Sequence, residues 1–329
     1  MNKINRRRFL ISAAAGSVLA GCAEWGWRAP EKGPIAAVFP QPVEAAAMQA
    51  AYQGLVRVRD EMGIPILVLQ SAADATAISQ ALRSAAESEP TLILAIGEMC
   101  AAPARQIATE FPQQRFTLIQ AEAEASGAKL NAYLVLQQQS AWLAGAFAGL
   151  FTRRGMVGQI GAVRDSTALK ARAAFIAGYA SALPKARFLS NFGTDIAKLA
   201  RAQIDAGADV IFLTQGTPDA ALIALARERN IRLIGHGRDW VAQTPDVYAA
   251  SAVFDPGVAV RQCAHDLYDA LWKSGLIHRI GVGRSEAVRL TLAQDIGSTI
   301  AQRMDLYQRE MMAGAFKIPE SYDGPEFRS

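Results

Sequence analysis

The sequence predicts an α/β protein with two Rossmann-like, doubly wound parallel-sheet domains joined by a hinge. Short apolar runs alternate with longer segments whose apolar residues recur at helical spacing, which is typical of βαβ units. This alternation occurs twice along the chain. The 329 residues are also enough for two domains, because one domain takes roughly 150 residues.

The first half alternates regularly from residue 34 onward. Its apolar runs have the composition of strands buried on both faces of a parallel sheet. The predicted strands are 34–39, 64–70, 91–96 and 115–120, and the predicted helices are 43–59, 74–88 and 101–111.

The second half repeats the pattern without repeating the residues. Its predicted helices are 140–152, 167–182, 196–206 and 219–229, and its predicted strands are 156–161, 187–190, 209–214 and 231–235. A strand over 248–254, a long helix over 257–274, weak strands near Ile280 and Val288, a helix over 293–313 and an extended tail complete the chain. We expect one domain from 34–136 plus about 252–290, and the other from 137–251 plus about 291–329.

The first 21 residues have the pattern of an export signal. Arg6, Arg7 and Arg8 precede an apolar run that is too short to span a bilayer, and small residues lead to Cys22. The segment LAGC resembles the bacterial lipobox, in which the cysteine is acylated and becomes the first residue of the mature chain. The arginines resemble a twin-arginine signal, although an ordinary Sec signal also fits them. We therefore expect a signal peptide over 1–21, lipidation at Cys22, a tether over 22–33, and a site of action on the outer side of the cell membrane.

Composition narrows the possible partners. The formal net charge is +4, and Lys3 with the three signal arginines supplies four positive charges, so the mature chain is nearly neutral. A nucleic-acid partner is not expected, because no basic stripe remains to neutralise phosphates. Besides Cys22 the chain has Cys100 and Cys263, and both are expected to pack as small apolar residues rather than to form a disulfide.

No motif for catalysis or cofactor binding is present. The glycines around residues 155–161 lack the dinucleotide-binding spacing, and neither a P-loop nor a G-x-S-x-G elbow occurs. His236, His265 and His278 lack metal-ligand spacing. The sequence therefore favours a binding protein over an enzyme and predicts neither a cofactor nor a metal.

Several segments carry a resemblance to a known family. They are QQQSAWLAGAFAG at 137–149, GQIG at 158–161 with AFIAGY at 174–179, AGADVI at 206–211, IGHGRD at 234–239, and AGAF at 313–316 with DGP at 323–325. In order and spacing they resemble the basic membrane protein family of bacterial lipoproteins. Members of that family are substrate-binding proteins of ABC importers with the type I periplasmic-binding-protein fold. The resemblance implies capture of a small ligand, often a nucleoside, between two domains, and an ABC permease as membrane partner.

Candidate ligand-binding residues follow from the strand ends. Ligands of open α/β sheets bind beyond the carboxyl ends of the strands, and a nucleoside needs aromatic faces and polar groups. The candidates are Phe39, Gln41, Glu98, Asp165, Gln215, His236, Asp239, Trp240 and Phe254.

The sequence departs from the family pattern at expected polar anchors. Gly237 and Phe254 stand where nucleoside-binding members carry an acid and a lysine, and Glu44 is the nearest substitute for an acid missing after the first strand. These departures leave open a different heterocycle or a less polar ligand. Two alternatives to transport also stay open. One is a sensory lipoprotein that passes a ligand signal to a membrane receptor. The less favoured one is an enzyme that uses Glu98, Asp165, His236 and Asp239.

Overall fold

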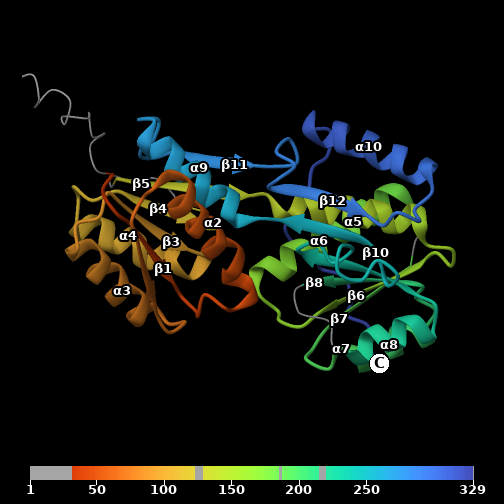
Figure 1. The fold of residues 1–329 in the computed structure, drawn as a ribbon. Helices are drawn as coiled ribbons and strands as arrows, with labels where there is room; N and C mark the ends of the chain where they lie inside the picture. The colour runs from red at the N-terminus through yellow and green to blue at the C-terminus, as the bar shows by residue number, and fades with distance from the viewer. Residues whose placement is uncertain (1–31, 123–128, 185–186, 215–219, 329) are drawn as a thin grey trace, which may run out of the picture. The chain divides into compact units, whose positions relative to one another are not determined.

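The computed structural model describes residues 32–122, 129–184, 187–214 and 220–328. The predicted signal peptide, Cys22 and most of the predicted tether lie outside these residues, as does Gln215. Residues 34–329 form one compact unit, within which the described strands make two six-stranded sheets (Figure 1).

The first sheet is parallel throughout, with strand order β11-β5-β4-β3-β1-β2. Helices α2 and α9 cover one face, and α3 and α4 cover the other. The sheet and these helices are called the first lobe below. Its strands are β1 (Ile35–Phe39), β2 (Ile66–Gln70), β3 (Leu92–Ile96), β4 (Phe116–Ile119), β5 (Leu130–Val135) and β11 (Ile277–Ile280), and its helices are α2 (Ala46–Met62), α3 (Ala75–Glu87), α4 (Ala101–Glu110) and α9 (Pro256–Tyr268).

The second sheet has strand order β12-β10-β9-β8-β6-β7 and is parallel except for the β10–β12 pair. Helices α5 and α6 cover one face, α7 and α8 cover the other, and α10 packs on α5. This is the second lobe. Its strands are β6 (Met156–Gly161), β7 (Arg187–Phe192), β8 (Val210–Thr214), β9 (Arg232–Gly237), β10 (Tyr248–Phe254) and β12 (Val288–Leu292), and its helices are α5 (Gln137–Phe151), α6 (Ser166–Ala182), α7 (Ile196–Asp205), α8 (Ala220–Glu228) and α10 (Ser298–Met312).

Three connections join the lobes, and hydrogen bonds tie them to one another. The chain crosses at Leu136, at Asp255 and through residues 281–287. Leu136 donates its backbone N–H to Ile280 at 2.8 Å, and Asp255 donates to Ala287 at 2.8 Å. The crossings therefore lie side by side, which is the arrangement that a hinge between two lobes requires.

Glycines allow the closest helix packing in each lobe. A Cβ on Gly54 of α2 would lie 2.4 Å from the Cα of Gly257 in α9. In the second lobe, a Cβ on Gly145 of α5 would lie 1.9 Å from the carbonyl oxygen of Phe175 in α6. Only a residue without a side chain lets two backbones approach this closely.

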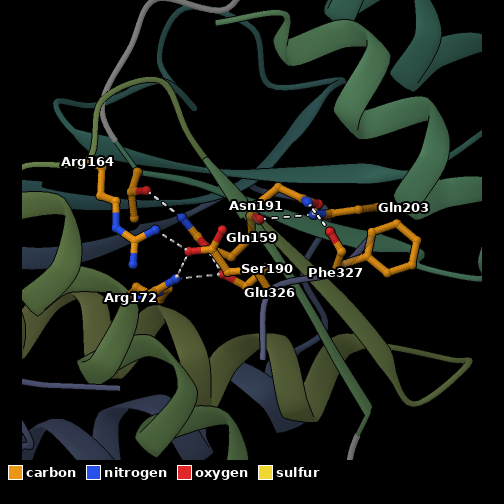
Figure 2. A network of polar contacts seen from close by, with 9 residues as sticks. Gln159, Arg164, Arg172, Ser190, Asn191, Gln203, Glu326 and Phe327 are labelled. Carbon is orange, nitrogen blue, oxygen red and sulfur yellow. Dashed lines mark hydrogen bonds and ion pairs between the residues drawn. The ribbon is translucent and has the colours of Figure 1, made fainter. Parts of the chain in front are cut away.

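The C-terminal tail runs along the edge of the second sheet, beside β7 (Figure 2). Phe327 donates its N–H to the carbonyl oxygen of Ser190 at 2.8 Å, so the tail pairs with the edge strand. The carboxylate of Glu326 lies 3.5 Å from a guanidinium nitrogen of Arg172, whose side chain is 4% exposed. The rings of Phe192 and Tyr322 also contact this guanidinium.

The predicted fold class is confirmed, and the differences are local. Strand β5 was not predicted, and α10 begins at Ser298 rather than at residue 293. Cys100 and Cys263 are free and buried, as expected of small apolar residues. Burial raises the pKa of each thiol to about 12, which keeps it protonated and unreactive.

Candidate functional site

A pocket of about 230 Å³ has walls from both lobes. From the first lobe, about two turns of α2 and the start of α9 line it. From the second lobe, the last residues of β9 and β10 and the beginning of β12 line it. The lining residues are Ala50, Gln53, Gly54, Arg57, Gly237, Arg238, Asp239, Val253, Phe254, Asp255, Gly257 and Arg289.

The sheet topology explains why these residues meet. Gly237 ends β9 and Phe254 ends β10, and the two strands are parallel neighbours, so both end at the same edge. Strand β12 runs antiparallel to β10, and its register places Arg289 opposite Val253. The chain then crosses to the first lobe at Asp255, next to the packed helices α2 and α9. The pocket thus lies at a sheet edge of the kind where α/β proteins bind ligands.

Small residues form much of the pocket wall beside one aromatic ring. Gly54, Gly237 and Gly257 line the pocket without contributing a side chain, and Gly237 has φ +94°, a conformation that favours glycine. Phe254 supplies an apolar ring face suited to a flat ligand. The volume lies below the roughly 300–1,000 Å³ of pockets for drug-sized molecules, so it suits a ligand about the size of one heterocycle.

Charged side chains line the rest of the pocket. Asp255 caps α9 by accepting a hydrogen bond from the N–H of Gly257 at 2.8 Å. Burial raises the pKa of the Asp255 carboxyl, and this bond and the nearby arginines oppose the rise. Asp239 accepts a hydrogen bond from the N–H of Ala242 at 3.1 Å and lies 3.9 Å from Arg289. Both carboxylates are therefore already engaged by protein groups.

The structure gathers three of the predicted site residues at this pocket. Asp239 and Phe254 line it, and the ring of His236 lies 5.0 Å from that of Phe254, measured between centroids. Glu98 and Asp165 lie outside the pocket lining. Asp165 caps α6, and Ser166, the first residue of that helix, donates a hydrogen bond to Glu98. That bond joins the two lobes.

Three further predicted residues lie apart from the pocket lining. Trp240 is 7% exposed and packs on Tyr248, and its indole N–H donates to the carbonyl oxygen of His236. Phe39 is fully buried at the end of β1, against Tyr52. Gln41 is half-buried just after that strand.

Sequence reasoning did not select Gln53, Arg57 and Arg289, which also line the pocket. They do not follow the carboxyl end of a parallel strand, which was the criterion for the candidates. The spacing of polar residues in α2 did carry a signal. Gln53 and Arg57 are four residues apart, so they lie on the same face of the helix, next to Gly54. Arg289 follows the third crossing, and nothing in its local sequence distinguishes it.

His236 is a buried histidine without a hydrogen-bond partner among the described residues. Its side chain is 4% exposed, and neither ring nitrogen has a protein partner. The rings of Phe212 and Phe254 flank it. Burial lowers the pKa of the imidazole to about 3, so the ring stays neutral over the physiological range.

We expect His236→Leu to weaken the acid sensitivity of folding. In the unfolded chain His236 takes up a proton as the pH falls below about 6.5, whereas the folded protein keeps it neutral down to pH of about 3. The unfolded state then binds more protons, so this residue lowers the free energy of unfolding by at most about 1.4 kcal/mol per pH unit in that window. In urea titrations between pH 7 and 4, the free energy of unfolding should fall less steeply with pH in the variant than in wild type.

The exposed His265 provides the matched control. His265→Leu should lose stability with falling pH as steeply as wild type does, because the buried His236 is retained. If the free energy of unfolding depends on pH equally in wild type and in His236→Leu, His236 is not the buried neutral histidine described above.

A larger hollow, of about 610 Å³, lies on the second lobe alone. Two of its carboxylates are paired with arginines, Asp246 with Arg227 at 2.7 Å and Asp295 with Arg232 at 2.5 Å. It has no aromatic lining residue and no wall from the first lobe. These features make the smaller pocket the better candidate.

The described residues contain neither a metal-binding cluster nor a helix that could span a membrane. No group of three or more His, Cys, Asp or Glu side chains is arranged to hold a metal ion. No helix among them combines the length and apolar character needed to cross a membrane.

The fold is that of the solute-binding proteins of ABC transporters. The structure of a solute-binding protein of an ABC transporter system from Aeropyrum pernix superposes with a TM-score of 0.71 at 16% identity, covering 88% of this chain and 94% of that one. At this identity the likeness establishes the fold alone.

The family model for PnrA-like ABC transporter substrate-binding proteins, named Bmp, matches residues 44–320. The chain belongs to this family, so the predicted family is confirmed. A purine-binding protein from Brucella abortus is 28% identical over 52% of this chain, and the match spans only 50% of that relative. The CD4+ T-cell-stimulating antigen of Listeria monocytogenes is 25% identical over 77% of this chain and 76% of its own length.

Proposed function

We propose that this protein is a lipid-anchored solute-binding protein that captures a small heterocycle, such as a nucleoside or nucleobase, for an ABC importer. The family membership supports the transport role, and the relative described as purine-binding supports the ligand class. In this proposal the two lobes are domains that close on the ligand, and the permease recognises the closed form.

The pocket between the lobes is the observation that carries this proposal. It combines walls from both lobes, an aromatic ring and a position beside the three connections. A ligand that contacts both walls favours the closed arrangement over the open one, since it gains its full set of contacts only there. The proposed role needs no chemical change of the ligand, so the ligand should leave unaltered.

Mass spectrometry of ligand released from the purified protein tests the function directly. We expect a nucleobase, a nucleoside or a related heterocycle. Adding such a compound back should raise Tm with concentration, because a ligand at 100 times its Kd stabilises the folded state by about 2.7 kcal/mol. A panel of nucleobases, nucleosides and flavins that leaves Tm unchanged would refute the proposed ligand class. Recovery of a chemically converted ligand would instead support an enzyme.

We expect Cys22→Ser to release the protein from membranes without unfolding it. The predicted anchor is an acyl chain on this thiol, and a serine hydroxyl does not replace it in the lipobox. Fractionation of cells should move the variant to the soluble fraction, while its circular dichroism and Tm match those of detergent-extracted wild type. A variant that stays in the membrane fraction would show that Cys22 is not the anchor.

A further inference from the structure

We infer that the ligand of the pocket carries an anionic group, a carboxylate or a phosphate, beside its ring. This inference rests on the proposed function, because it specifies the chemistry of the same pocket. Arg57, Arg238 and Arg289 line the pocket, against the two carboxylates of Asp239 and Asp255. Positive charge therefore exceeds negative charge among the lining residues.

The engagement of the carboxylates increases this imbalance. Asp255 accepts a hydrogen bond from the first turn of α9. Asp239 accepts one from the turn after β9 and lies 3.9 Å from Arg289. Among the described residues, neither Arg57 nor Arg238 has a carboxylate within 4.0 Å, so neither guanidinium group is held in an ion pair with the protein. An anionic ligand group would supply the missing ion-pair partner in charge-assisted hydrogen bonds.

The two guanidinium groups come from different lobes. Arg57 lies on the exposed face of α2 in the first lobe. Arg238 follows β9 in the second lobe, and its guanidinium is stacked 4.1 Å from the centroid of the Trp240 ring. That stacking restricts the side chain and leaves the N–H edges free to bind an anion in the plane of the group. An anion between them would attract both lobes and favour closure.

The rest of the pocket limits the remainder of the ligand. Phe254 is the aromatic residue of the lining, and the volume of about 230 Å³ suits one small heterocycle that bears the charged group. We therefore commit to a small heterocyclic acid or monophosphate rather than a neutral nucleoside.

Matched probe pairs that differ by the anionic group test this inference. The pairs are uracil and orotate, nicotinamide and nicotinate, and adenosine and adenosine 5′-monophosphate, each titrated by calorimetry and by thermal shift. In at least one pair the acid should bind about tenfold more tightly than its neutral partner, and the preference should shrink as salt rises. The small anions phosphate and acetate, tested separately, show whether the charge alone suffices.

Variants assign the preference to the pocket. Arg57→Gln and Arg238→Gln should each weaken binding of the acid more than binding of its neutral partner, so that the preference for the acid falls severalfold. Arg59→Gln is the control, because Arg59 lies on the same helix, is exposed and pairs with Asp60 at 2.7 Å. An equal loss in the Arg59 variant would assign the effect to overall charge and overturn the inference.

The outcomes separate this inference from the proposed function. Neutral compounds that bind as tightly as their acids would overturn the anionic ligand and leave the heterocycle-binding function standing. Failure of every probe to bind would overturn both. An acid preference that persists in the double variant Arg57→Gln/Arg238→Gln would overturn the assignment to these two arginines.

Discussion

Gly145→Ala should destabilise the protein by at least about 2 kcal/mol, although alanine is the better helix former. Intrinsic propensity alone favours Ala over Gly inside a helix by about 1 kcal/mol. Here the added methyl carbon would lie 1.9 Å from the carbonyl oxygen of Phe175 and 2.8 Å from the backbone nitrogen of Tyr179. Both atoms belong to the backbone of α6, so the whole helix must move, and overpacking of this kind costs about 1–3 kcal/mol or more.

Urea denaturation of Gly145→Ala measures this effect, and Gly178→Ala should reproduce it from the other helix. A Cβ on Gly178 would lie 1.9 Å from the carbonyl oxygen of Trp142 in α5. Gly283→Ala is the control, because nothing lies within 4 Å of a Cβ at that position. A Gly145 variant as stable as wild type would mean that α5 and α6 do not pack backbone to backbone.

Glu326→Gln should cost about 2 kcal/mol, the largest effect that we expect from a single charge. It leaves the buried guanidinium of Arg172 without an anion, and breaking a fully buried pair costs about 3–5 kcal/mol. The cost is smaller here because the Glu326 side chain is 39% exposed, so water screens part of the interaction. Thermal and urea unfolding should both report the loss.

Two comparisons isolate the role of the buried cation. Glu320→Gln should change stability by less than about 0.5 kcal/mol, since Glu320 is 65% exposed and lies 3.7 Å from Lys170. In an Arg172→Met background, Glu326→Gln should also cost little, because the buried charge is gone. If Glu326→Gln costs the same with and without Arg172, the carboxylate acts through Arg164, which lies 2.6 Å from it, and not through the buried cation.

The sequence pattern was sufficient to predict the repeated alternation, because strands buried on both faces are apolar throughout. Strand β5 was missed for a physical reason. It contains Asn131, a residue uncommon in strands, which is 1% exposed and accepts a hydrogen bond from the Thr117 hydroxyl on the neighbouring strand. Asn131 is tolerated in the strand because its side chain bonds to Thr117, which lies 14 positions earlier in the chain. The residues around Asn131 do not reveal this partner, so the strand could not be predicted from local composition.

Only those pocket residues that lie at the ends of strands could be predicted from the sequence. Asp239 and Phe254 follow β9 and β10, so the strand-end rule selected them. The same rule selected Trp240, yet its ring fills the space above Gly235, where a Cβ would lie 2.0 Å from the indole. Arg57 comes from a helix of the other lobe, and its position depends on how α2 packs against α9, which no local pattern records.

The three crossings also determine how this chain could be divided. Neither sheet comes from one continuous stretch, since β11 enters the first sheet after β10 has completed most of the second. A fragment that ends at Phe254 lacks α9 and β11 of the first lobe and β12 and α10 of the second. Two fragments produced by a cut at this position each lack parts of both sheets, so they reach the native structure only by associating. Recovery of the folded protein from the two fragments would therefore report that they have assembled.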